Sequence, residues 1–396
     1  MSGTREKAEV AKQSLLRAIK GDLGSLAPEW ERAFLAVPRH LFLPSLIWLD
    51  VNDRWVPCVR EREPGRWLEA AYANSPIVTQ VNDGRPPGDD GVWPSSSASA
   101  PSIVFRMLEM LDIHDGMRLL EIGTGSGWNA GLLAARLGGD RVTSVEVDRD
   151  LTERARDVLA ENGRRPLVVF ADGAEGYSGR APYDRIVSTC SVRRVPYAWV
   201  EQSRPGTVVL TPWDNPWFCY GLLRLVVAED GTASGRFAPY SAFMLMRGQR
   251  SDIRLFRDVV RDEHRPDESS TELSPWEVTT NDRSARFAVG LWLGDVWHAW
   301  DEDPEEDSAE ARLWLATTDA SSGSWAAVDW DGKQEDRFRV RQYGPRRLWD
   351  ETEAAYQRWR AAGDPGPERF GLTVTQDGQV PWIDRPPTAI GRATPV

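Results

Sequence analysis

The most informative segment of this sequence is Leu119-Leu120-Glu121-Ile122-Gly123-Thr124-Gly125-Ser126-Gly127-Trp128. A short apolar run enters three alternate glycines, and the residues that follow, 128–137, have the pattern of a helix. Glycines at such a turn let the backbone approach a bound cofactor, and the free N–H groups at the start of the helix attract a carboxylate or a phosphate. Two interpretations stay open, because residues 125–130 also match the GxGxxA form of a dinucleotide-binding fingerprint.

Strands and helices alternate on both sides of this segment. Such alternation predicts an α/β fold with a parallel, doubly wound sheet. Further along, two apolar runs at 218–228 and 236–246 flank the turn signal Glu229-Asp230-Gly231 and predict an antiparallel hairpin. The expected strands are 118–122, 141–147, 167–171, 183–189 and 207–211, and the expected helices are 128–137, 151–162 and 196–202.

The N-terminal part is expected to begin with two helices. Apolar residues between Val10 and Ile19 lie on one side of the first helix, which should stop at Gly21, and the second should span 29–37. Residues 52–102 show little periodicity and many Pro, Gly and Ser residues, including the stretch 85–91. We therefore expect a long connection without regular structure, of the kind that carries function or covers a site.

A polar link at 262–274 precedes the last part of the chain. The pattern of the residues after this link predicts an α+β module with an amphipathic helix at 346–361. The apolar face of that helix is expected to pack in a core, with a peptide groove as the alternative. We expect three parts: N-terminal helices and substrate-facing loops packed on the core (1–102), a cofactor-binding core (103–250) and a C-terminal α+β domain (251–396). The expected strands of the last part are 287–292, 313–317, 325–330, 370–375 and 380–383.

Length and composition limit the class of protein. A chain of 396 residues exceeds one ordinary domain, and a hydrophobic content of 41% is that of a globular protein. No apolar run reaches the ~18 residues of a membrane span and the first residues are polar, so we expect a cytoplasmic protein that does not enter the membrane. Cys58, Cys190 and Cys219 are widely spaced, so we expect free thiols and neither disulfides nor a metal site.

Negative charge and tryptophan concentrate towards the C-terminus. Residues 251–396 hold 29 acidic and 18 basic residues, whereas residues 1–250 are almost balanced. Such a segment repels a phosphate backbone, so we do not expect nucleic acid as a partner. A solvated acidic surface is the simpler interpretation, and a basic peptide partner is the alternative. Ten of the 19 tryptophans also lie after residue 250, where they suit a core or a peptide groove equally.

Two acidic residues end later strands at the same edge of the predicted sheet. Glu146 lies 23 residues after Gly123, where a carboxylate can accept hydrogen bonds from ribose hydroxyls. Asp172-Gly173 follows the third strand, where a carboxylate can meet an adenine amino group. With Glu121 and the glycines, this set resembles class I S-adenosylmethionine-dependent methyltransferases more than nicotinamide enzymes. Surface charges at strand ends are the alternative interpretation.

Residues 8–250 are also similar to the protein-L-isoaspartate O-methyltransferase family. The similar segments occur in the family's order: 33–44 (AFLAVPRHLFLP), 71–72, 97–101 (SASAP), 120–128 and 181–186 (APYDRI). The resemblance implies a serine, here Ser99, beside the substrate carboxylate and the transferring methyl group. It also implies S-adenosylmethionine as cofactor and S-adenosylhomocysteine as product. It assigns the cofactor contacts to Glu121, Gly123, Thr124, Gly125, Gly127, Glu146, Asp172 and Gly173.

Other segments depart from the repair enzymes of that family. Residues 75–80 (SPIVTQ) replace a Pro-Leu-Pro-Ile-Gly-like stretch, Thr207 and Trp213 stand where glycines are usual, and the last 146 residues have no expected counterpart. Four segments resemble another group of the family instead, namely 94–97, 237–250, 342–349 and 370–375. This group consists of longer aspartyl methyltransferases of lanthipeptide, graspetide and imiditide biosynthesis, which modify ribosomally made peptides (RiPPs). The resemblance implies that a normal Asp side chain is methylated and that the ester closes to a succinimide (aspartimide), which persists or opens to isoaspartate.

Esterification of a carboxylate needs little acid–base chemistry. A peptide carboxylate with a pKa near ~4 is ionised at neutral pH, so positioning supplies most of the acceleration. Ser99 and Thr79 can donate hydrogen bonds to it, although both also suit ordinary loop positions. The four histidines, which are scattered, are expected to be structural: His40, His114, His264 and His298. The family motif, however, puts His40 beside the active site.

We therefore predict an S-adenosylmethionine-dependent peptide carboxyl O-methyltransferase that esterifies a normal Asp of a ribosomally made precursor peptide, with Ser99, Thr79 and His40 on the substrate side. Repair of isoaspartate in damaged proteins is the first alternative. The others are a protein that binds the cofactor without catalysis and a nicotinamide-dependent dehydrogenase. The last part, 251–396, is expected to recognise the peptide or to shield the site.

Overall fold

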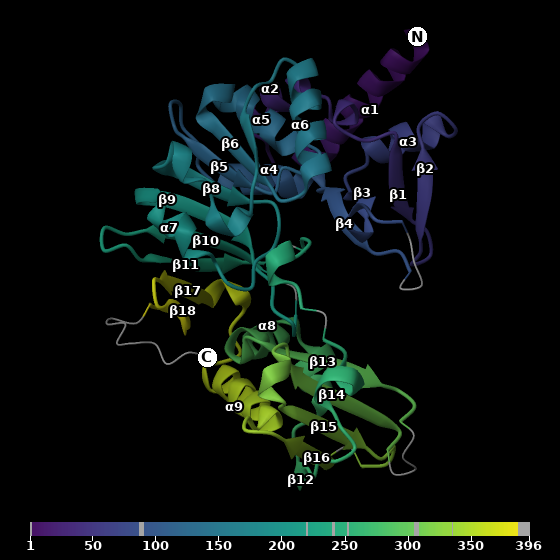
Figure 1. The fold of residues 1–396 in the computed structure, drawn as a ribbon, viewed down its shortest axis with the longest axis vertical. Coiled ribbons are helices and arrows are strands. Elements are labelled where there is room, and N and C mark those ends of the chain that lie inside the picture. Colours follow the sequence, from purple (N-terminus) through teal and green to yellow (C-terminus); the bar gives the residue numbers. More distant parts are fainter. Residues whose placement is uncertain are drawn as a thin grey trace. The chain divides into compact units, whose positions relative to one another are not determined.

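The computed structural model describes residues 2–86, 91–218, 221–239, 242–251, 253–304, 309–334 and 336–386 (Figure 1). The chain forms two compact units. The first comprises Met1–Cys190, Pro196–Thr211 and Arg224–Ala233, and the second comprises Ser191–Val195, Pro212–Leu223 and Ser234–Val396. The expected division into 1–102, 103–250 and 251–396 stays a prediction.

A parallel sheet forms the centre of the first unit. Its strands follow the order β9-β8-β5-β6-β7, and every neighbouring pair is parallel. This arrangement confirms the predicted doubly wound α/β fold. All residues of β5 and β6 are buried, as expected for the middle strands of a parallel sheet. The strands are β5 (Leu119–Ile122), β6 (Val142–Glu146), β7 (Leu167–Phe170), β8 (Tyr183–Ser188) and β9 (Ser203–Pro212).

Helices pack around this sheet (Figure 1). α2 packs closely on α5, because a Cβ atom on Gly131 of α5 would lie 3.0 Å from Val37, the residue that follows α2. The first helix continues past its expected stop at Gly21 and ends before Gly24, whose φ of +80° suits a helix C-terminus. The helices of this unit are α1 (Ser2–Leu23), α2 (Pro28–Ala36), α3 (Pro64–Ala71), α4 (Pro101–Met110), α5 (Trp128–Leu137), α6 (Arg149–Glu161) and α7 (Tyr197–Glu201).

A second, antiparallel sheet of the first unit has the order β2-β1-β3-β4. The expectation of an irregular connection over 52–102 is therefore wrong. β4 has the sequence Pro-Ser-Ser-Ser-Ala, whose lack of apolar alternation hides the strand. Residues 87–90 of the stretch 85–91 lie outside the described residues. The strands are β1 (Leu46–Asp50), β2 (Trp55–Val59), β3 (Ile77–Val81) and β4 (Pro94–Ala98).

The second unit contains an antiparallel sheet of order β12-β16-β15-β14-β13 and a hairpin of β17 and β18. The predicted strands at 313–317, 325–330, 370–375 and 380–383 are confirmed. The predicted amphipathic helix is α9 (Leu348–Ala361), and its apolar face is buried. The strands are β12 (Asp267–Thr271), β13 (Val296–Asp301), β14 (Ala311–Thr317), β15 (Trp325–Trp330), β16 (Phe338–Tyr343), β17 (Phe370–Thr375) and β18 (Gly378–Ile383).

The predicted strand at 287–292 is wrong, because these residues belong to helix α8 (Arg283–Leu293). A short apolar run does not distinguish a buried strand from a buried helix. The deciding signal is Asp282, whose side chain accepts hydrogen bonds from the N–H groups of Ser284 and Ala285 at the start of the helix.

The predicted turn at 229–231 is confirmed, since the Ala228 N–H donates to the Thr232 carbonyl at 2.8 Å. The strands on either side, β10 (Leu222–Val227) and β11 (Ala233–Ala238), are shorter than the predicted runs 218–228 and 236–246.

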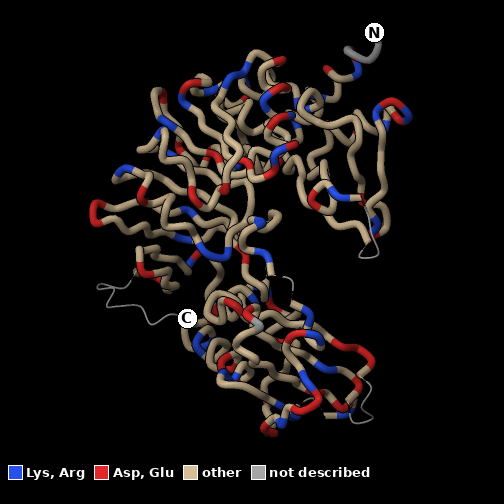
Figure 2. Tube along the Cα trace, viewed as in Figure 1, with Lys and Arg blue, Asp and Glu red and all other residues tan. Residues whose placement is uncertain are grey.

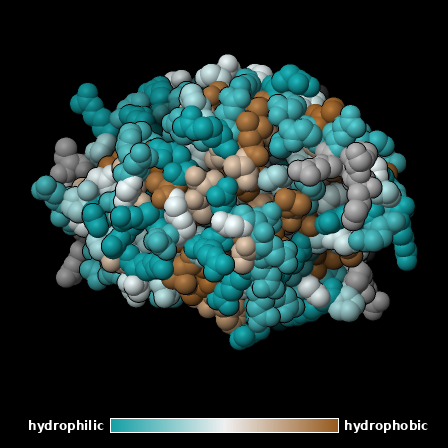
Figure 3. Space-filling view, turned by 90° about the horizontal axis from the view of Figure 1, so that it is seen from above, coloured by the Kyte–Doolittle hydropathy of each residue, from teal (hydrophilic) through white to brown (hydrophobic). Residues whose placement is uncertain are grey.

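Charged side chains of both signs are spread along the chain (Figure 2). Within the second unit, the buried Asp329 carboxylate pairs with Arg312 at 2.6 Å and with Arg341 at 3.3 Å. Apolar side chains on the face in Figure 3 form small patches among hydrophilic ones. Cys58 is a buried free thiol, and Cys219 lies outside the described residues. Among the described residues, no helix is long and apolar enough to cross a membrane.

Candidate functional site

The glycine loop between β5 and α5 lies at the carboxyl end of the parallel sheet. Gly123 and Gly125 have φ angles of +92° and +52°, in the region that favours glycine. A Cβ atom on Gly123 would lie 2.7 Å from the Thr189 hydroxyl, so no side chain fits there. A Cβ atom on Gly125 would lie 3.6 Å from the hydroxyl of Ser96 in β4. The loop therefore presents bare backbone opposite the hairpin of β3 and β4.

Glu146 ends β6 next to this loop, and its side chain is almost fully buried. One carboxylate oxygen accepts the Gly125 N–H at 2.8 Å, and the other accepts the N–H groups of Val147 and Asp148 at 3.0 and 3.1 Å. These donors fix the orientation of the carboxylate and stabilise its charge. The structure thus brings Glu146 and Gly125 into direct contact.

Glu121 supports the loop from inside the sheet. Its carboxylate accepts hydrogen bonds from Ser144 at 2.5 Å and from Asn129 at 2.6 Å. The Ser144 hydroxyl also lies 2.6 Å from that of Thr124. Burial raises the pKa of Glu121 to about 7, an effect that the hydrogen bonds from Ser144 and Asn129 partly offset. The buried acid therefore connects Thr124 of the loop with the first turn of α5.

Asp172 follows β7, the strand beside β6, and Phe170 of β7 is in register with Glu146. The Asp172 side chain is exposed and accepts the Ala174 N–H at 2.9 Å, while the carbonyl of the buried Gly173 accepts the Trp199 indole N–H at 2.8 Å. The predicted acids Glu146 and Asp172 thus lie at the ends of neighbouring strands.

Sequence reasoning missed two apolar residues at this edge. Val147 follows β6 and is 42% exposed, and Phe170 ends β7 and is 44% exposed. The Arg149 guanidinium lies 4.6 Å from the centre of the Phe170 ring. Exposed apolar side chains between two carboxylates suit the flat face of a purine base. The signal was present in the sequence, because Val147 directly follows Glu146 and Phe170 lies two residues before Asp172.

Two of the residues predicted to lie on the substrate side, Thr79 and Ser99, lie on and just after the β3–β4 hairpin. Thr79 of β3 faces β4, where its hydroxyl lies 3.5 Å from that of Ser96. Ser99 follows β4, and its carbonyl accepts a hydrogen bond from Arg39 at 3.0 Å. Sequence reasoning missed Arg39, although it stands in the quoted segment 33–44.

His40 pairs with Tyr72, since its Nδ1 atom lies 2.6 Å from the tyrosine hydroxyl. Burial lowers the pKa of His40, with smaller contributions from Arg60 and Lys12. The imidazole is therefore neutral at neutral pH. Of the other histidines, His114 pairs with Asp112, whereas His264 and His298 belong to the second unit.

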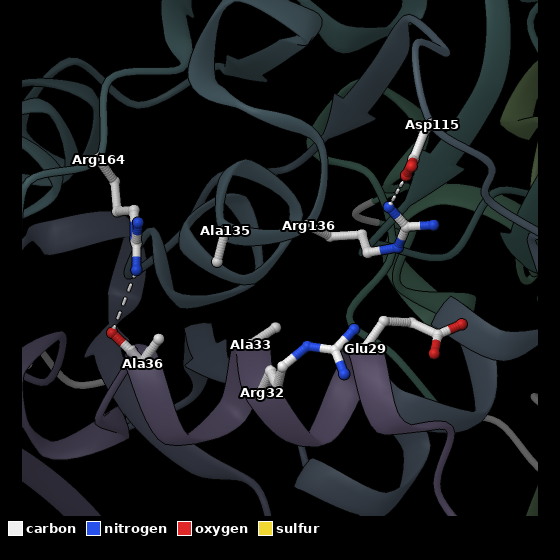
Figure 4. A pocket seen from close by; sticks show the side chains of 8 residues that line it. All are labelled: Glu29, Arg32, Ala33, Ala36, Asp115, Ala135, Arg136 and Arg164. Atoms are coloured by element: carbon white, nitrogen blue, oxygen red, sulfur yellow. Dashed lines mark hydrogen bonds and ion pairs between the residues drawn. The ribbon is translucent and has the colours of Figure 1, made fainter.

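A separate pocket of about 530 Å³ lies between α2 and the end of α5 (Figure 4). The Arg136 guanidinium points to Asp115, and Arg164 donates to the carbonyl of Ala36 at 3.4 Å (Figure 4). These contacts fix helix ends, and the lining residues include none of the predicted site residues. Among the described residues, no group of three or more His, Cys, Asp or Glu residues could hold a metal ion.

The residues at the carboxyl edge of the sheet fit S-adenosylmethionine. The bare glycine loop admits the close approach of the cofactor's amino acid part. Glu146 can accept hydrogen bonds from ribose hydroxyls, and Val147, Phe170 and Asp172 can surround adenine.

Comparisons with known proteins agree with this fit. Residues 62–231 match the family model "Protein-L-isoaspartate(D-aspartate) O-methyltransferase (PCMT)". The protein-L-isoaspartate O-methyltransferase of Pyrococcus horikoshii is 35% identical over 203 residues, which cover 51% of this chain and 77% of the relative. The enzyme of the same name from Pyrococcus abyssi is 36% identical over 222 residues, which cover 56% of this chain and 87% of the relative.

A solved structure of a protein-L-isoaspartate O-methyltransferase aligns with a TM-score of 0.54 and 22% identity, covering 94% of this chain and all of that chain. Because the alignment covers 94% of this chain, it includes most of the last 146 residues. The expectation that these residues have no counterpart is therefore wrong for the fold. The relatives decide between the two cofactor interpretations in favour of S-adenosylmethionine. This chain belongs to the protein-L-isoaspartate O-methyltransferase family and is an S-adenosylmethionine-dependent protein carboxyl O-methyltransferase.

Proposed function

We propose that this protein methylates the side-chain carboxylate of an Asp residue in a ribosomally made precursor peptide, and that the ester then closes to a succinimide (aspartimide). One observation carries the proposal: the Ser-rich strand β4 runs beside the glycine loop. The Ser96 hydroxyl lies 3.6 Å from the position that a Cβ atom on Gly125 would take. A peptide carboxylate bound at this strand would therefore face a cofactor bound on the loop.

When bound, S-adenosylmethionine supplies an electrophilic methyl group on a positively charged sulfur. A carboxylate oxygen of the peptide forms the new O–CH3 bond, the S–CH3 bond breaks, and its electron pair stays on sulfur in S-adenosylhomocysteine. In the second step, the backbone nitrogen of the following peptide residue attacks the ester carbonyl, and methanol leaves with the proton of that nitrogen. The first step needs no base, because the carboxylate is already ionised.

The residues of this chain would orient the carboxylate rather than activate it. We assign hydrogen-bond donation to Ser99 and Thr79. His40 would adjoin the carboxylate as a neutral group, because burial lowers its pKa. A neutral imidazole adds no positive charge beside the sulfonium. Correct orientation of two reactants can supply about 7–11 kcal/mol of the barrier reduction, so such a site can be effective without an acid or a base.

The choice of a normal Asp rests on the strand that enters the hairpin. Residues 75–80 depart from the family's repair enzymes, and the register of β3 against β4 shifts on both sides of Gln80. Gln80 accepts a hydrogen bond from Ser95 of β4 at 2.9 Å. A changed wall beside the carboxylate favours a changed substrate, because specificity follows the contacts of the reacting group. The resemblance to the longer peptide-modifying enzymes points in the same direction.

Recognition of the peptide by residues 251–396 is part of this proposal. The second unit has aromatic side chains near its surface, such as Phe256, which is 66% exposed and packs edge-on against Trp314. Hydrogen–deuterium exchange of the whole protein with and without the precursor peptide tests the assignment. Protection within 251–396 supports peptide recognition, and protection confined to the first unit leaves only the shielding role.

Mass spectrometry with S-adenosylmethionine and matched peptides tests the proposed reaction. One peptide is the precursor encoded beside the gene, the second carries isoaspartate, and the control has Asn at the modified position. We expect the precursor to gain about 14 Da and then to lose about 32 Da as methanol leaves. Modification of the Asn control, or of neither aspartyl peptide, would contradict the proposal.

Repair of isoaspartate is the second candidate. It is favoured by relatives of 35–36% identity that carry the name protein-L-isoaspartate O-methyltransferase, and by the alignment of a solved chain of that name with 94% of this chain. Methylation of the isoaspartyl peptide, with none of the precursor, would establish this function instead.

A further inference from the structure

The Arg39 side chain donates five hydrogen bonds to backbone carbonyls beside the candidate site. Its side chain is 0% exposed. One terminal nitrogen donates to the carbonyls of Ala71 and Ala73 at 3.2 and 3.0 Å. The other donates to three carbonyls, those of Ser75 at 3.1 Å, Ala98 at 3.1 Å and Ser99 at 3.0 Å. A single side chain therefore holds two segments that are distant in the sequence.

These carbonyls lie at the open end of the β3–β4 hairpin. Residues 71–75 lead into β3, residues 98–99 leave β4, and Ile77 pairs with Ala98 where the two strands meet. The guanidinium carbon also lies 5.4 Å from the centre of the Trp128 ring. Trp128 follows the glycine loop directly and donates its indole N–H to the Val37 carbonyl at 3.0 Å. Arg39 thus adjoins the substrate-side hairpin and the start of α5 together.

The charge of Arg39 makes this arrangement costly. Burial lowers the pKa of Arg39 to about 9, so the side chain remains a cation at neutral pH. Among the described residues it forms no ion pair, and the charge is compensated by carbonyl dipoles and by the face of the Trp128 ring. A buried cation without a carboxylate is expensive unless the geometry of its hydrogen bonds is good. An apolar residue could fill a core at this position more cheaply, which suggests a requirement beyond packing.

We propose that Arg39 is a positioning residue for methyl transfer, which acts by holding the backbone of Ser99 and the open end of the hairpin. The inference rests on the proposed function, in which Ser99 orients the substrate carboxylate. The planar fork of an arginine can bind several carbonyls in fixed directions, whereas the single ammonium of a lysine cannot. A displacement of about 1 Å at a reacting group can reduce a rate about 100-fold.

A purely structural role is the competing explanation, and Arg185 provides a matched control. Arg185 is also buried, and it donates to the carbonyls of Leu111, Asp112 and Asp184. It is in register with Leu119, the first residue of β5, and so lies at the amino end of the sheet, away from the glycine loop. Loss of its bonds should destabilise the unit without moving Ser99.

The test compares Arg39→Lys with Arg185→Lys in the full-length protein. We expect both variants to unfold at lower temperature and both to bind S-adenosylhomocysteine within about twofold of the wild type. Only Arg39→Lys should lower kcat, by about 100-fold. In a double-mutant cycle, Arg39→Lys should have little further effect on kcat in a Ser99→Ala background, because the hydroxyl that Arg39 is proposed to position is then absent. Equal kcat values for the two lysine variants, or additive effects in the cycle, would overturn the proposal.

Hydrogen–deuterium exchange of residues 94–99 separates this inference from the proposed function. Faster exchange in Arg39→Lys, but not in Arg185→Lys, would support the positioning role of Arg39. This result would hold even if the wild type methylated neither peptide, an outcome that refutes only the proposed function. Unchanged exchange in both variants would reject the positioning role. If Arg39→Lys does not fold, Arg39→Gln, which is uncharged and keeps two donors, takes its place in the same comparison.

Discussion

The side-chain amide nitrogen of Gln80 donates a hydrogen bond of 3.0 Å to the carboxylate of Asp148. Gln80 belongs to the substrate-side strand β3, and Asp148 lies two residues after Glu146. The N–H group of Asp148 in turn donates to the Glu146 carboxylate, which also accepts from Gly125. A short chain of hydrogen bonds therefore connects the hairpin with the acid that we assign to the cofactor ribose.

Replacing Gln80 by Met removes this connection while keeping a similar side-chain length. A hydrogen bond to a charged group contributes about 1.5–3 kcal/mol, so affinity for S-adenosylhomocysteine should fall about tenfold. Titration calorimetry measures the change, and Gln13→Met, at a glutamine that bonds to Glu9 within α1, is the control. Equal affinities of the two variants would show that Gln80 does not support the cofactor site.

Local and long-range interactions divide what the sequence could predict from what it could not. The strand, glycine loop and helix at 119–137 were predictable, because each depends on neighbouring residues. The hairpin was not, since β4 gains its stability from pairing with β3 rather than from its own Ser-rich sequence. Arg39 was unpredictable for a related reason. Its partners are backbone carbonyls 32–60 residues away, which leave no trace in side-chain patterns.

Ser99→Ala should lower the methylation rate and leave cofactor affinity unchanged. The change removes one hydroxyl, while the Ser99 carbonyl that Arg39 binds remains. Loss of one oriented donor to the reacting carboxylate should reduce kcat about 10- to 100-fold. Initial rates with the precursor peptide and calorimetry with S-adenosylhomocysteine give the two quantities. Ser97→Ala, two residues earlier in β4, is the control. An equal fall in rate and affinity for Ser99→Ala would reject its assigned role.

Asp172 allows its structural and cofactor roles to be separated. Its carboxylate accepts the Ala174 N–H at 2.9 Å, a bond that Asn can also accept. Asp172→Asn should therefore keep the backbone turn. Its side-chain NH2 group would face the adenine amino group, so two donors would meet and cofactor binding should weaken about tenfold. Asp172→Ala should weaken binding similarly and also lower the unfolding temperature. If calorimetry gives wild-type affinity for both variants, adenine does not bind at Asp172.

Glu121 predicts a pH dependence of stability. Because its pKa rises to about 7 in the folded protein, the folded state holds a proton that the unfolded state has already lost. The contribution of Glu121 to stability is therefore greatest below the unfolded pKa near ~4.3, falls as pH rises towards 7, and is lost above it.

Glu121→Gln keeps a neutral group that can bond to both Asn129 and Ser144, so it should stabilise the protein relative to wild type at pH 8 but much less at pH 5. Thermal unfolding at both pH values measures this difference, with the exposed Glu153→Gln in α6 as control. A wild-type protein that gains stability over Glu121→Gln between pH 5 and 8 would mean that the carboxylate is held in its charged form by the Ser144 and Asn129 hydrogen bonds.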